Sequence, residues 1–524
     1  ITRTTTSNER GIFVAALLPV GTYDVSARSP GATEARRTGV GLHLGETVEL
    51  ALQLGAIQLA AIEVTGERPL VDPARVEAAT QLSTEAVAGL PNNGRNFLNL
   101  TLLTPNVAIV QGPDGDELTV SGQRGIYNNI SVDGADFNNP FFGEQRGGQR
   151  PAFTFNLDAV QEMVVVSNGA NPEFGRSAGG FVNVLTKSGT NELHGSLHYF
   201  GQNDAASASQ FRGQGSPDFT QHQFGLTLGG PVVRDRAFFF IAYDQQVYNQ
   251  TKQTNANRID PLLRAWMDTA FGGALAGDYG PIERTNGANA LLVKLDWRLN
   301  TMHSLSLKYN YTNSRQENGT FDVDTWARSA NGLERDYSHA VNGSLVSLLT
   351  SSMTNEFRFQ FAREYRPRPY EGPTFPGTDG SVFRTSGRPF PDTGADFANG
   401  YRFGMPFFLP IDALDQRIQL LDNLSYVRGN HLFKIGAEFN RTNENQTFIG
   451  FANERFIFGS VDGFLNYVAQ GPTYVECSDG SSNATGTCPA GTSITGPLQL
   501  YLQLAPVVPG QTARDVGTQN LIQV

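Results

Sequence analysis

The chain has 524 residues, more than one ordinary domain holds, so several structural units are expected. It combines 57 glycines, 35 phenylalanines and 16 tyrosines with only 17% charged residues, which favours a β-rich protein over a helical one. A formal net charge of -11 argues against nucleic acid as a partner, because a nucleic-acid surface carries a basic stripe. The longest apolar run, Phe13 to Val20, is too short for a membrane-spanning helix, which needs about 20 residues.

Residues 1–58 predict a small antiparallel β-sandwich. Short alternating strands are expected at Tyr23-Val25-Ala27 and at Val48-Leu50-Leu52, with glycine turns between them. The chain opens on ITRTTTSNERG, which is typical of the middle of a domain, and closes on the strand-like Asn520 to Val524. Both ends are therefore expected to be truncated, and a missing signal peptide carries no information about location.

Residues 59–71 contain a short β-prone segment, Ile62-Glu63-Val64-Thr65, and then a glycine, a proline and mixed charges. The residues after this segment are expected to form a linker. Two interpretations stay open from the residues alone. The segment is either the last strand of the preceding sandwich or a strand that another protein adds to its own sheet, a mode in which main-chain hydrogen bonds supply the affinity.

Residues 72–190 predict a compact mixed α+β domain. Apolar residues come in runs, as in strands covered on both faces. Glycines at 175, 179 and 180 predict a tight turn before the last strand. The expected elements are helices at Thr84–Gly89 and Asn96–Leu103 and strands near Leu118–Val120, Asn129–Val132, Met163–Val166 and Phe181–Thr186.

The same glycine turn contains GRSAG, which fits the G-x-S-x-G pattern of a hydrolase nucleophile elbow. That elbow needs a helix after the serine, whereas Ser177 is followed by the strand-like Phe181 to Val184. We therefore do not expect an enzyme.

From residue 191 the pattern changes to strict alternation. In one segment Val293, Leu295 and Trp297 interleave with Lys294 and Asp296, and about ten such strands follow one another. Strands of about ten residues cross a bilayer when tilted. Short turns at 300–303 and 428–431 alternate with long polar connections at about 250–287, 314–336, 366–413 and 468–515. Short turns on one side and long loops on the other are typical of an outer-membrane sheet.

Two motifs carry a family resemblance. EFGRSAGGFVNVLTKSGTNELHGSLHYF, which ends at Phe200, resembles the plug-to-barrel junction of TonB-dependent outer-membrane receptors. SGQRGIYNNISVDGADFNNP, from Ser121 to Pro140, resembles the plug of the same family. The type is Oar-like, with an N-terminal carboxypeptidase-regulatory-like domain. The resemblance implies an all-β-dominated fold, with a truncated β-sandwich (1–58), a TonB-box linker (59–71), an α+β plug (72–190) and part of a 22-stranded antiparallel transmembrane barrel (191–524).

The resemblance also implies site residues. It identifies Ile62, Glu63, Val64 and Thr65 as the TonB box, which would pair with TonB and its ExbB/ExbD energy complex. Arg124 is either part of a surface turn or buried with carboxylate partners inside a barrel, and the resemblance favours the buried interpretation. The residues that match the family's plug motif are Arg124, Gly125, Asp133, Gly134, Gly175, Arg176, Gly179 and Gly180.

The implied function is a receptor and transporter in the outer membrane of a Gram-negative bacterium, with its N-terminal domain in the periplasm. It would contact outer-membrane lipid and import an unknown extracellular ligand, such as a siderophore, a carbohydrate or a peptide, by TonB-coupled movement of the plug. The alternative is an adhesin or surface-assembly protein that uses the barrel as an anchor. No cofactor is expected. His194 and His198 share one side of a strand but lack nearby ligands at metal-binding spacing, so polar residues facing the lumen are the favoured interpretation.

The chain has two cysteines, Cys477 and Cys488, in a polar connection rich in Ser, Gly, Thr and Asn. A local disulfide in an oxidising compartment is expected, and two free thiols are the alternative. Because the pair comes after the strand-like Arg455 to Phe458 within a long polar insertion, we place it in an extracellular loop.

Overall fold

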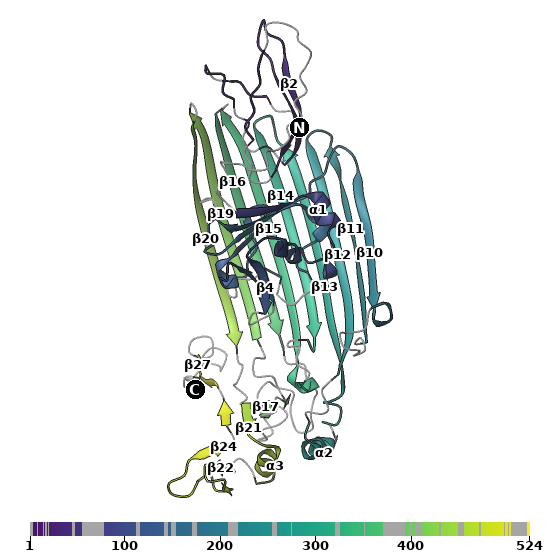
Figure 1. The fold of residues 1–524 in the computed structure, drawn as a ribbon, viewed down its shortest axis with the longest axis vertical. Coiled ribbons are helices and arrows are strands. Elements are labelled where there is room, and N and C mark those ends of the chain that lie inside the picture. Colours follow the sequence, from purple (N-terminus) through teal and green to yellow (C-terminus); the bar gives the residue numbers. More distant parts are fainter. Residues whose placement is uncertain are drawn as a thin grey trace, which may run out of the picture.

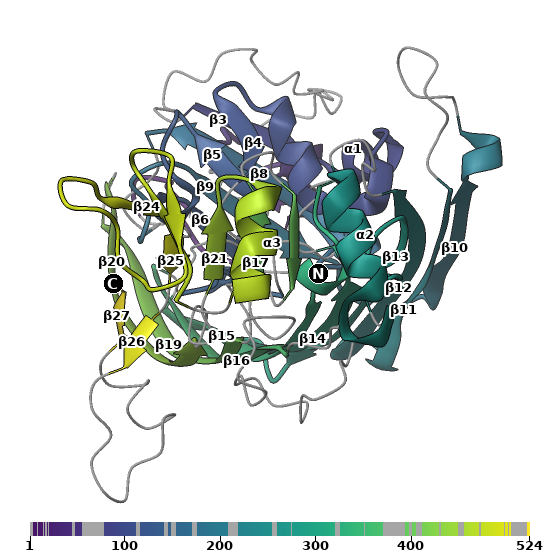
Figure 2. The same ribbon diagram turned by 90° about the horizontal axis from the view of Figure 1, so that it is seen from below.

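The dominant element of the computed structural model is a nine-stranded antiparallel sheet, here called the wall sheet. Its strands follow one another in chain order and curve into an arc (Figures 1 and 2). They are β10 (His194–Asn203), β11 (Phe219–Val233), β12 (Ala237–Gln253), β13 (Pro281–Arg298), β14 (His303–Glu317), β15 (Leu333–Thr350), β16 (Met353–Arg368), β19 (Ile411–Arg428) and β20 (His431–Phe448).

The description covers only part of the chain. The residues described are 4–7, 9–13, 15, 18, 20–43, 48–54, 78–111, 116–140, 145–147, 153–169, 175–207, 218–253, 259–273, 275–319, 325–350, 352–369, 394–397, 401–404, 411–428, 431–448, 455–470, 473–496, 498–500, 502–504 and 521–523.

Alternation of side chains gives the wall sheet two different faces. Residues in register across three strands, Phe239, Leu295 and Leu307, all lie on the convex face. Exposed apolar side chains recur on that face, whereas polar residues such as Lys294 and Lys308 are buried on the concave face. The predicted alternation is therefore confirmed, and it results from the two-residue period of a β-strand.

The strands are longer than the sequence predicted. Except for β10, they have 15 to 18 residues rather than about ten. The extra length lies in polar ends, such as Thr285 to Asn289 of β13, which pair in register with β14. Backbone pairing continues where the apolar alternation has stopped, so the alternation marked only the central part of each strand.

A second unit, here called the inner domain (residues 78–190), lies on the concave side of the wall sheet (Figure 2). Its five-stranded mixed sheet has the order β3-β8-β9-β6-β7, and a separate hairpin joins β4 to β5. The elements are β3 (Ala78–Leu82), α1 (Thr84–Gly89), the 3₁₀ helices η1 (Asn93–Arg95) and η2 (Phe97–Leu103), β4 (Val107–Gln111), β5 (Asp116–Val120), η3 (Gly125–Tyr127), β6 (Asn129–Val132), β7 (Ala135–Asp136), η4 (Leu157–Ala159), β8 (Val160–Asn168) and β9 (Phe181–Thr186).

The inner domain matches its predicted elements closely. Phe97, Val120, Met163, Val165 and Val184 are fully or almost fully buried in one apolar cluster, as the apolar runs predicted. The first helix begins after Ser83, whose hydroxyl accepts from the Ala86 amide and caps the helix. The second predicted helix is a 3₁₀ helix, η2, whose Asn96 cap accepts from Leu98.

At the N-terminal end, the described residues form one hairpin of β1 (Gly21–Ala27) and β2 (Ala35–Leu42). The first predicted strand is therefore confirmed. The second, at Val48 to Leu52, is wrong, because those residues have no strand partner among those described, and β1 pairs with Ala35–Leu42 instead. Just after β2, His43 contacts Glu162 of the inner domain, with Nδ1 and Oε1 3.1 Å apart.

At the opposite end, three long connections of the wall sheet and the segment after β20 pack into one lobe, here called the outer cap (Figure 1). Phe397, Tyr401, Phe403, Phe458 and Phe464 form its buried aromatic centre. The cap elements are α2 (Pro261–Thr269), η8 (Ala270–Gly273), η9 (Arg328–Ala330), β17 (Gly394–Phe397), β18 (Arg402–Gly404), β21 (Arg455–Phe458), α3 (Val461–Gln470), β22 (Val475–Cys477), β23 (Ser482–Asn483), β24 (Ile494–Gly496) and β25 (Leu498–Leu500).

Smaller elements complete the description. The remaining strands, β26 (Leu502–Leu504) and β27 (Leu521–Gln523), pair with each other. A further 3₁₀ helix, η5 (Asp204–Ala206), comes directly after β10. Among the described residues, no helix is long and apolar enough to cross a membrane.

Candidate functional site

The family motif Asp133-Gly134 forms the tight turn between β6 and β7. Both residues have positive φ, 52° and 73°, a conformation that glycine adopts freely and aspartate tolerates. A Cβ at Gly134 would collide with the guanidinium of Arg358 on β16. The turn therefore lies directly against the wall sheet, and a side chain at residue 134 would displace the Arg358 guanidinium.

The Asp133 side chain ties this turn to two other elements. Its Oδ1 accepts from the Thr186 amide at 2.8 Å, and its Oδ2 accepts from the Thr186 hydroxyl at 2.7 Å. Lys308 of β14 donates to Oδ2 at 2.5 Å. Burial alone would raise the pKa of Asp133, but Lys308, Lys294 and these hydrogen bonds lower it far below its usual value. The carboxylate is thus held ionised at the contact between the inner domain and the wall.

The predicted glycine turn before β9 is closed by backbone contacts. The Gly180 amide donates to Asn128 Oδ1 at 2.9 Å, and the Gly179 amide donates to the Tyr127 carbonyl at 3.0 Å. A Cβ on Gly180 would lie 2.6 Å from Val120, so the turn requires glycine there. Gly175 accepts from Asn129 through its carbonyl at 2.8 Å.

Ser177, the residue singled out by the hydrolase-like pattern, takes part in the same turn. Its hydroxyl donates to the Gly180 carbonyl at 2.8 Å, and β9 comes next in the chain. A strand therefore occupies the place where a nucleophile elbow needs a helix.

Arg124 directly precedes η3, and its side chain is exposed among the described residues. The wall sheet is an open arc of nine strands, so burial of Arg124 inside a closed barrel, the interpretation that the resemblance favours, stays a prediction. The neighbouring Gly125 is buried, and its amide donates to Glu117 at 3.3 Å. The nearby Glu117 carboxylate thus accepts from the backbone of the turn, while the Arg124 side chain extends into solvent.

Asp136, at the end of β7, is the centre of the contact with the far part of the wall sheet. Its carboxylate pairs with Arg417 of β19 and with Arg176, whose Nη1 lies 2.5 Å from Oδ2. Its amide donates to Gln419 at 3.0 Å, and its carbonyl accepts from Gln360 at 3.0 Å. Every polar group of this residue is engaged, so it fixes β7 to two wall strands.

A second group of contacts lies just beyond Asp136. Asn139 donates to Glu364 at 2.8 Å and to Asp415 at 3.1 Å, and the Gly147 amide donates to Glu364 at 2.7 Å. Arg366 balances part of this negative charge, because it lies 3.0 Å from Asp415. Burial lowers the pKa of the nearby Arg146 to about 10, although the Glu364 carboxylate opposes that shift.

On the near side of the arc, His198 of β10 lies between two carboxylates. Its Nδ1 is 2.6 Å from Asp158 of the inner domain, and its Nε2 is 2.9 Å from Asp244 of β12. Asn156 also donates to Asp244, at 2.9 Å. Burial raises the pKa of Asp158, but hydrogen bonds from His198 and Arg95 lower it to about 2. His198 therefore joins the inner domain to the wall, as a polar residue on the concave face.

Sequence reasoning found the motif turns but missed most of their partners. Asp136 and Asn139 lie inside the recognised DGADFNNP stretch, so the motif itself was a signal for them. For the wall partners Lys308, Glu364 and Arg417, the only signal in the sequence was that each is a polar position in an alternating strand. The described residues contain no group of three or more His, Cys, Asp or Glu side chains placed to hold a metal ion. The segment Ile62 to Thr65 lies outside the described residues.

This arrangement, an arc of antiparallel strands around a small mixed domain, has counterparts among known proteins. A family model described as an outer membrane beta barrel domain matches residues 185–272 and 256–473, together more than half of the chain. The chain belongs to the outer-membrane β-barrel family. This assignment, together with the transporters among its relatives, places the protein in the outer membrane of a Gram-negative bacterium.

Three proteins illustrate what this β-barrel family member is similar to. The TonB-dependent transporter Oar of Myxococcus xanthus is 26% identical over 332 residues, which are 59% of this chain and 30% of the transporter. The probable TonB-dependent siderophore receptor PirA of Acinetobacter baumannii is 25% identical over 34% of this chain and 22% of its own length. The outer membrane transporter YddB from Escherichia coli superposes with a TM-score of 0.51 at 13% identity, covering 80% of this chain and 52% of that one.

Each of these matches covers only part of the relative. The chain spans less than a third of the curated relatives it matches and about half of the YddB structure. At 13% identity the structural likeness concerns the fold alone. The named relatives are transporters and receptors rather than enzymes.

Proposed function

We propose that the protein binds an extracellular ligand and imports it by TonB-coupled movement of the inner domain, which acts as a plug. The Oar relative is named a TonB-dependent transporter, and the PirA relative is named a probable TonB-dependent siderophore receptor. The proposal rests mainly on how the inner domain is attached to the wall sheet, because the attachment differs between the two sides of the arc.

On the side of β12 and β13 the attachment includes apolar contacts beside the hydrogen bonds of Asp244 and Lys294. Phe240, Ala242 and Leu292 belong to the main apolar cluster of the inner domain, and Ala288 and Ala290 pack with Phe153. In the part of the chain that is described, these are the wall residues that share apolar clusters with the inner domain. Separating these surfaces would expose apolar area to water, which costs about 25 cal/mol per Å².

On the side of β14 to β19 the attachment is polar. The inner domain is held there by Lys308, Gln360, Glu364, Asp415, Arg417 and Gln419. Water can replace polar partners, so a hydrogen bond between neutral groups contributes only about 0.5–1.5 kcal/mol net, and one to a charged group contributes about 1.5–3 kcal/mol. In the proposal, the inner domain separates from β14 to β19, where water can replace its polar partners, and stays attached to β12 and β13 through their apolar contacts.

The position of the segment Ile62 to Thr65 fits a pulling mechanism. It precedes β3, which lies at the edge of the inner sheet and, among the described strands, pairs with β8 alone. A force applied upstream of β3 would peel this edge strand away before it reached the buried strands. The first step of opening in the proposal is therefore the loss of the β3–β8 pairing.

The TonB contact can be tested before the ligand is known. In the full-length protein, a cysteine at Val64 should form a disulfide cross-link with cysteines on the periplasmic domain of TonB. A cysteine at Leu54, an exposed position in the described N-terminal part, serves as the matched control. Val64→Pro removes a main-chain donor and should abolish binding of TonB. Equal cross-linking from both positions would contradict the proposed TonB box.

The movement needs its own readout. Ala79 of β3 packs against the buried Val164, Val166 and Phe181, so a cysteine there should be shielded from a thiol reagent at rest. We expect labelling of Ala79→Cys in cells only when TonB is present and energised. An adhesin that uses the barrel as an anchor would give the same labelling with and without TonB, which would overturn the transport proposal.

A further inference from the structure

Two arginines face each other on the convex face of the wall sheet. Arg315 of β14 and Arg335 of β15 are directly opposite in the antiparallel register. Both lie on the face that carries Leu307 and Val341, which are 42% and 45% exposed. Like charges placed directly opposite on one face destabilise a sheet unless an anion compensates them.

The local carboxylates compensate only one of the two. Arg315 pairs with Glu317 on its own strand. In the part of the chain that is described, the Arg335 guanidinium has no ion-pair partner, and its Nε has no hydrogen-bond acceptor. The pair therefore keeps an unmatched positive charge at a site where two guanidinium groups can reach the same anion.

The rows of residues beside the pair set its depth in the membrane. The next outward-facing row on these strands is Asn313 and Tyr337, and the row after that is Tyr311 and His339. Tyr337 stacks on Tyr365 of β16 with ring centroids 6.4 Å apart. Tyrosine belts mark the boundary between hydrocarbon and headgroups.

The pair lies just beyond this belt. One row is two residues along the strand, so Arg315 and Arg335 lie about 7 Å past Tyr337, at the level of the headgroups. They are at the end of the sheet that carries the outer cap, where long connections indicate the extracellular side (Figure 1). The lipids that meet this site belong to the outer leaflet.

We propose that Arg315 and Arg335 hold a phosphate monoester on the headgroup of an outer-leaflet lipid. Guanidinium groups bind phosphate oxygens through paired N–H donors, and Arg335 supplies the unmatched positive charge while Arg315 adds further donors to the same phosphate. Arg363 is on the same face but lies in the row of Tyr311 and His339, two rows from the pair, so it is not part of this site. The apolar residues that begin three rows from the pair, such as Val341, Phe361 and Leu307, would contact the acyl chains of the same lipid, which free phosphate lacks.

The test uses the full-length protein and lipid A, a saccharolipid whose headgroup carries phosphate monoesters. Retention of lipid A in detergent is measured by native mass spectrometry. Arg315→Gln with Arg335→Gln should lower retention about tenfold or more, since a hydrogen bond to a charged group contributes about 1.5–3 kcal/mol. Arg234→Gln, at an exposed position of the opposite, short-turn end, should leave retention unchanged.

Two further variants separate lipid binding from a folding defect. Glu317→Gln releases Arg315 from its local partner and should raise lipid A retention severalfold, a gain that misfolding cannot produce. Arg335→Lys keeps the charge but loses the paired donors, so it should retain less lipid A than the unaltered protein and more than Arg335→Gln.

Comparison of different lipids and of inorganic phosphate shows whether the site binds the phosphate of a lipid or any phosphate. We expect dephosphorylated lipid A and phosphatidylglycerol, a phosphodiester, to be retained weakly, and inorganic phosphate not to displace lipid A. Equal retention of dephosphorylated lipid A would overturn the proposal in favour of acyl-chain packing alone. Displacement by inorganic phosphate would overturn it in favour of a simple anion site.

Discussion

Asp133 of the inner domain and the buried Lys308 of the wall sheet form an ion pair, although 175 residues separate them in the chain. Lys308 also donates to the Val132 carbonyl at 3.2 Å, so one ammonium group holds both the strand end and the turn of the family motif. The turn at Asp133 is thus held in place by Lys308 of β14 as well as by its own backbone conformation.

We expect Asp133→Asn to destabilise the full-length protein by about 3–5 kcal/mol, because it leaves the buried Lys308 without its carboxylate. Asparagine keeps the shape and tolerates the positive φ, so charge is the main change. Unfolding by denaturant in detergent measures the effect. Adding Lys308→Met should recover part of the loss. Asp235→Asn, at a positive-φ residue in an exposed turn, is the control.

Charge on the two faces of the wall sheet should have different consequences. Leu295 lies on the convex face between Phe239 and Leu307, whereas the adjacent Asp296 points to the concave side. Leu295→Arg should cost about 2–4 kcal/mol if this position is at the bilayer midplane, and Asp296→Arg should be mild. The folded fraction in isolated outer membranes, read from its heat-modifiable migration on gels, compares the two variants. Equal losses would reverse our assignment of the faces.

The outer cap should loosen as pH rises through the range below neutrality. Asp278 is buried in the cap, and it accepts from the Ser329 amide at 2.6 Å. The Gly404 amide donates to the Ser329 hydroxyl at 2.7 Å, so the carboxyl joins three connections. Burial raises the pKa of Asp278 from 3.8 to about 6, against the Ser329 hydrogen bonds and Arg328.

The folded cap binds this proton more tightly than the unfolded chain does. The folded cap keeps the proton up to about pH 6, and the unfolded chain releases it near 3.8, so cap stability falls as pH rises between these values. Deuterium exchange at the Ser329 and Gly404 amides should be slower at about pH 5 than at about pH 7.5, after correction for intrinsic rates. Asp278→Asn should remove most of this difference. A variant with unchanged pH dependence would mean that another group controls the cap.

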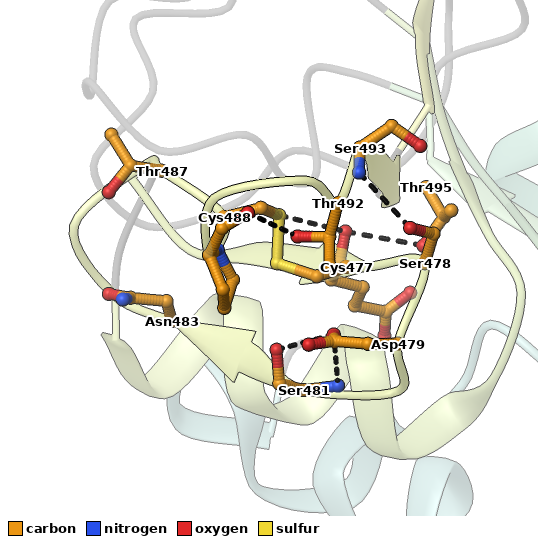
Figure 3. The surroundings of a disulfide bond; sticks show 12 residues. Cys477, Ser478, Asp479, Ser481, Asn483, Thr487, Cys488, Thr492, Ser493 and Thr495 are labelled. Atoms are coloured by element: carbon orange, nitrogen blue, oxygen red, sulfur yellow. Dashed lines mark hydrogen bonds between the residues drawn. A yellow bond between two sulfur atoms is a disulfide. The ribbon is translucent and has the colours of Figure 1, made fainter.

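Cys477 and Cys488 form a disulfide with Cα atoms 5.7 Å apart (Figure 3). The bond closes a loop that also contains β23 and is held by hydrogen bonds such as Ser493 to Ser478. Closing a loop of this length contributes about 3 kcal/mol in the chain-entropy model, less any strain. Replacing both cysteines by serine should therefore speed proteolysis within residues 473–496.

Thiol labelling of intact cells checks the bond itself. We expect labelling only after reduction, because both sulfurs are in the bond. If the serine variant also loses affinity for a ligand, the loop takes part in binding; if only proteolysis changes, the bond stabilises the loop alone. Labelling without reductant would contradict the disulfide in the cell.

Several features of the fold could be predicted from sequence because they depend on local patterns. The alternation of Val293, Leu295 and Trp297 gave the faces of β13, since a strand turns its side chains over every two residues. The helix expected at Thr84–Gly89 is α1, and the glycine turn followed by β-branched residues gave β9. The family motif added the turn at Asp133, whose positive φ is itself a local property.

Other features were decided by the tertiary structure. Arg124 and Arg176 are both arginines of the same motif set, yet Arg124 is exposed and Arg176 pairs with Asp136. The partner of Asp136 on the wall, Arg417, lies 281 residues away and is reached only through the register of successive strands. From the alternation of a strand, the face on which a polar residue lies can be predicted. The residues that it contacts across that face cannot. Which charged residues meet across the interface depends on the register of every intervening strand pair and on the curvature of the whole sheet. A short stretch of sequence does not determine either of these.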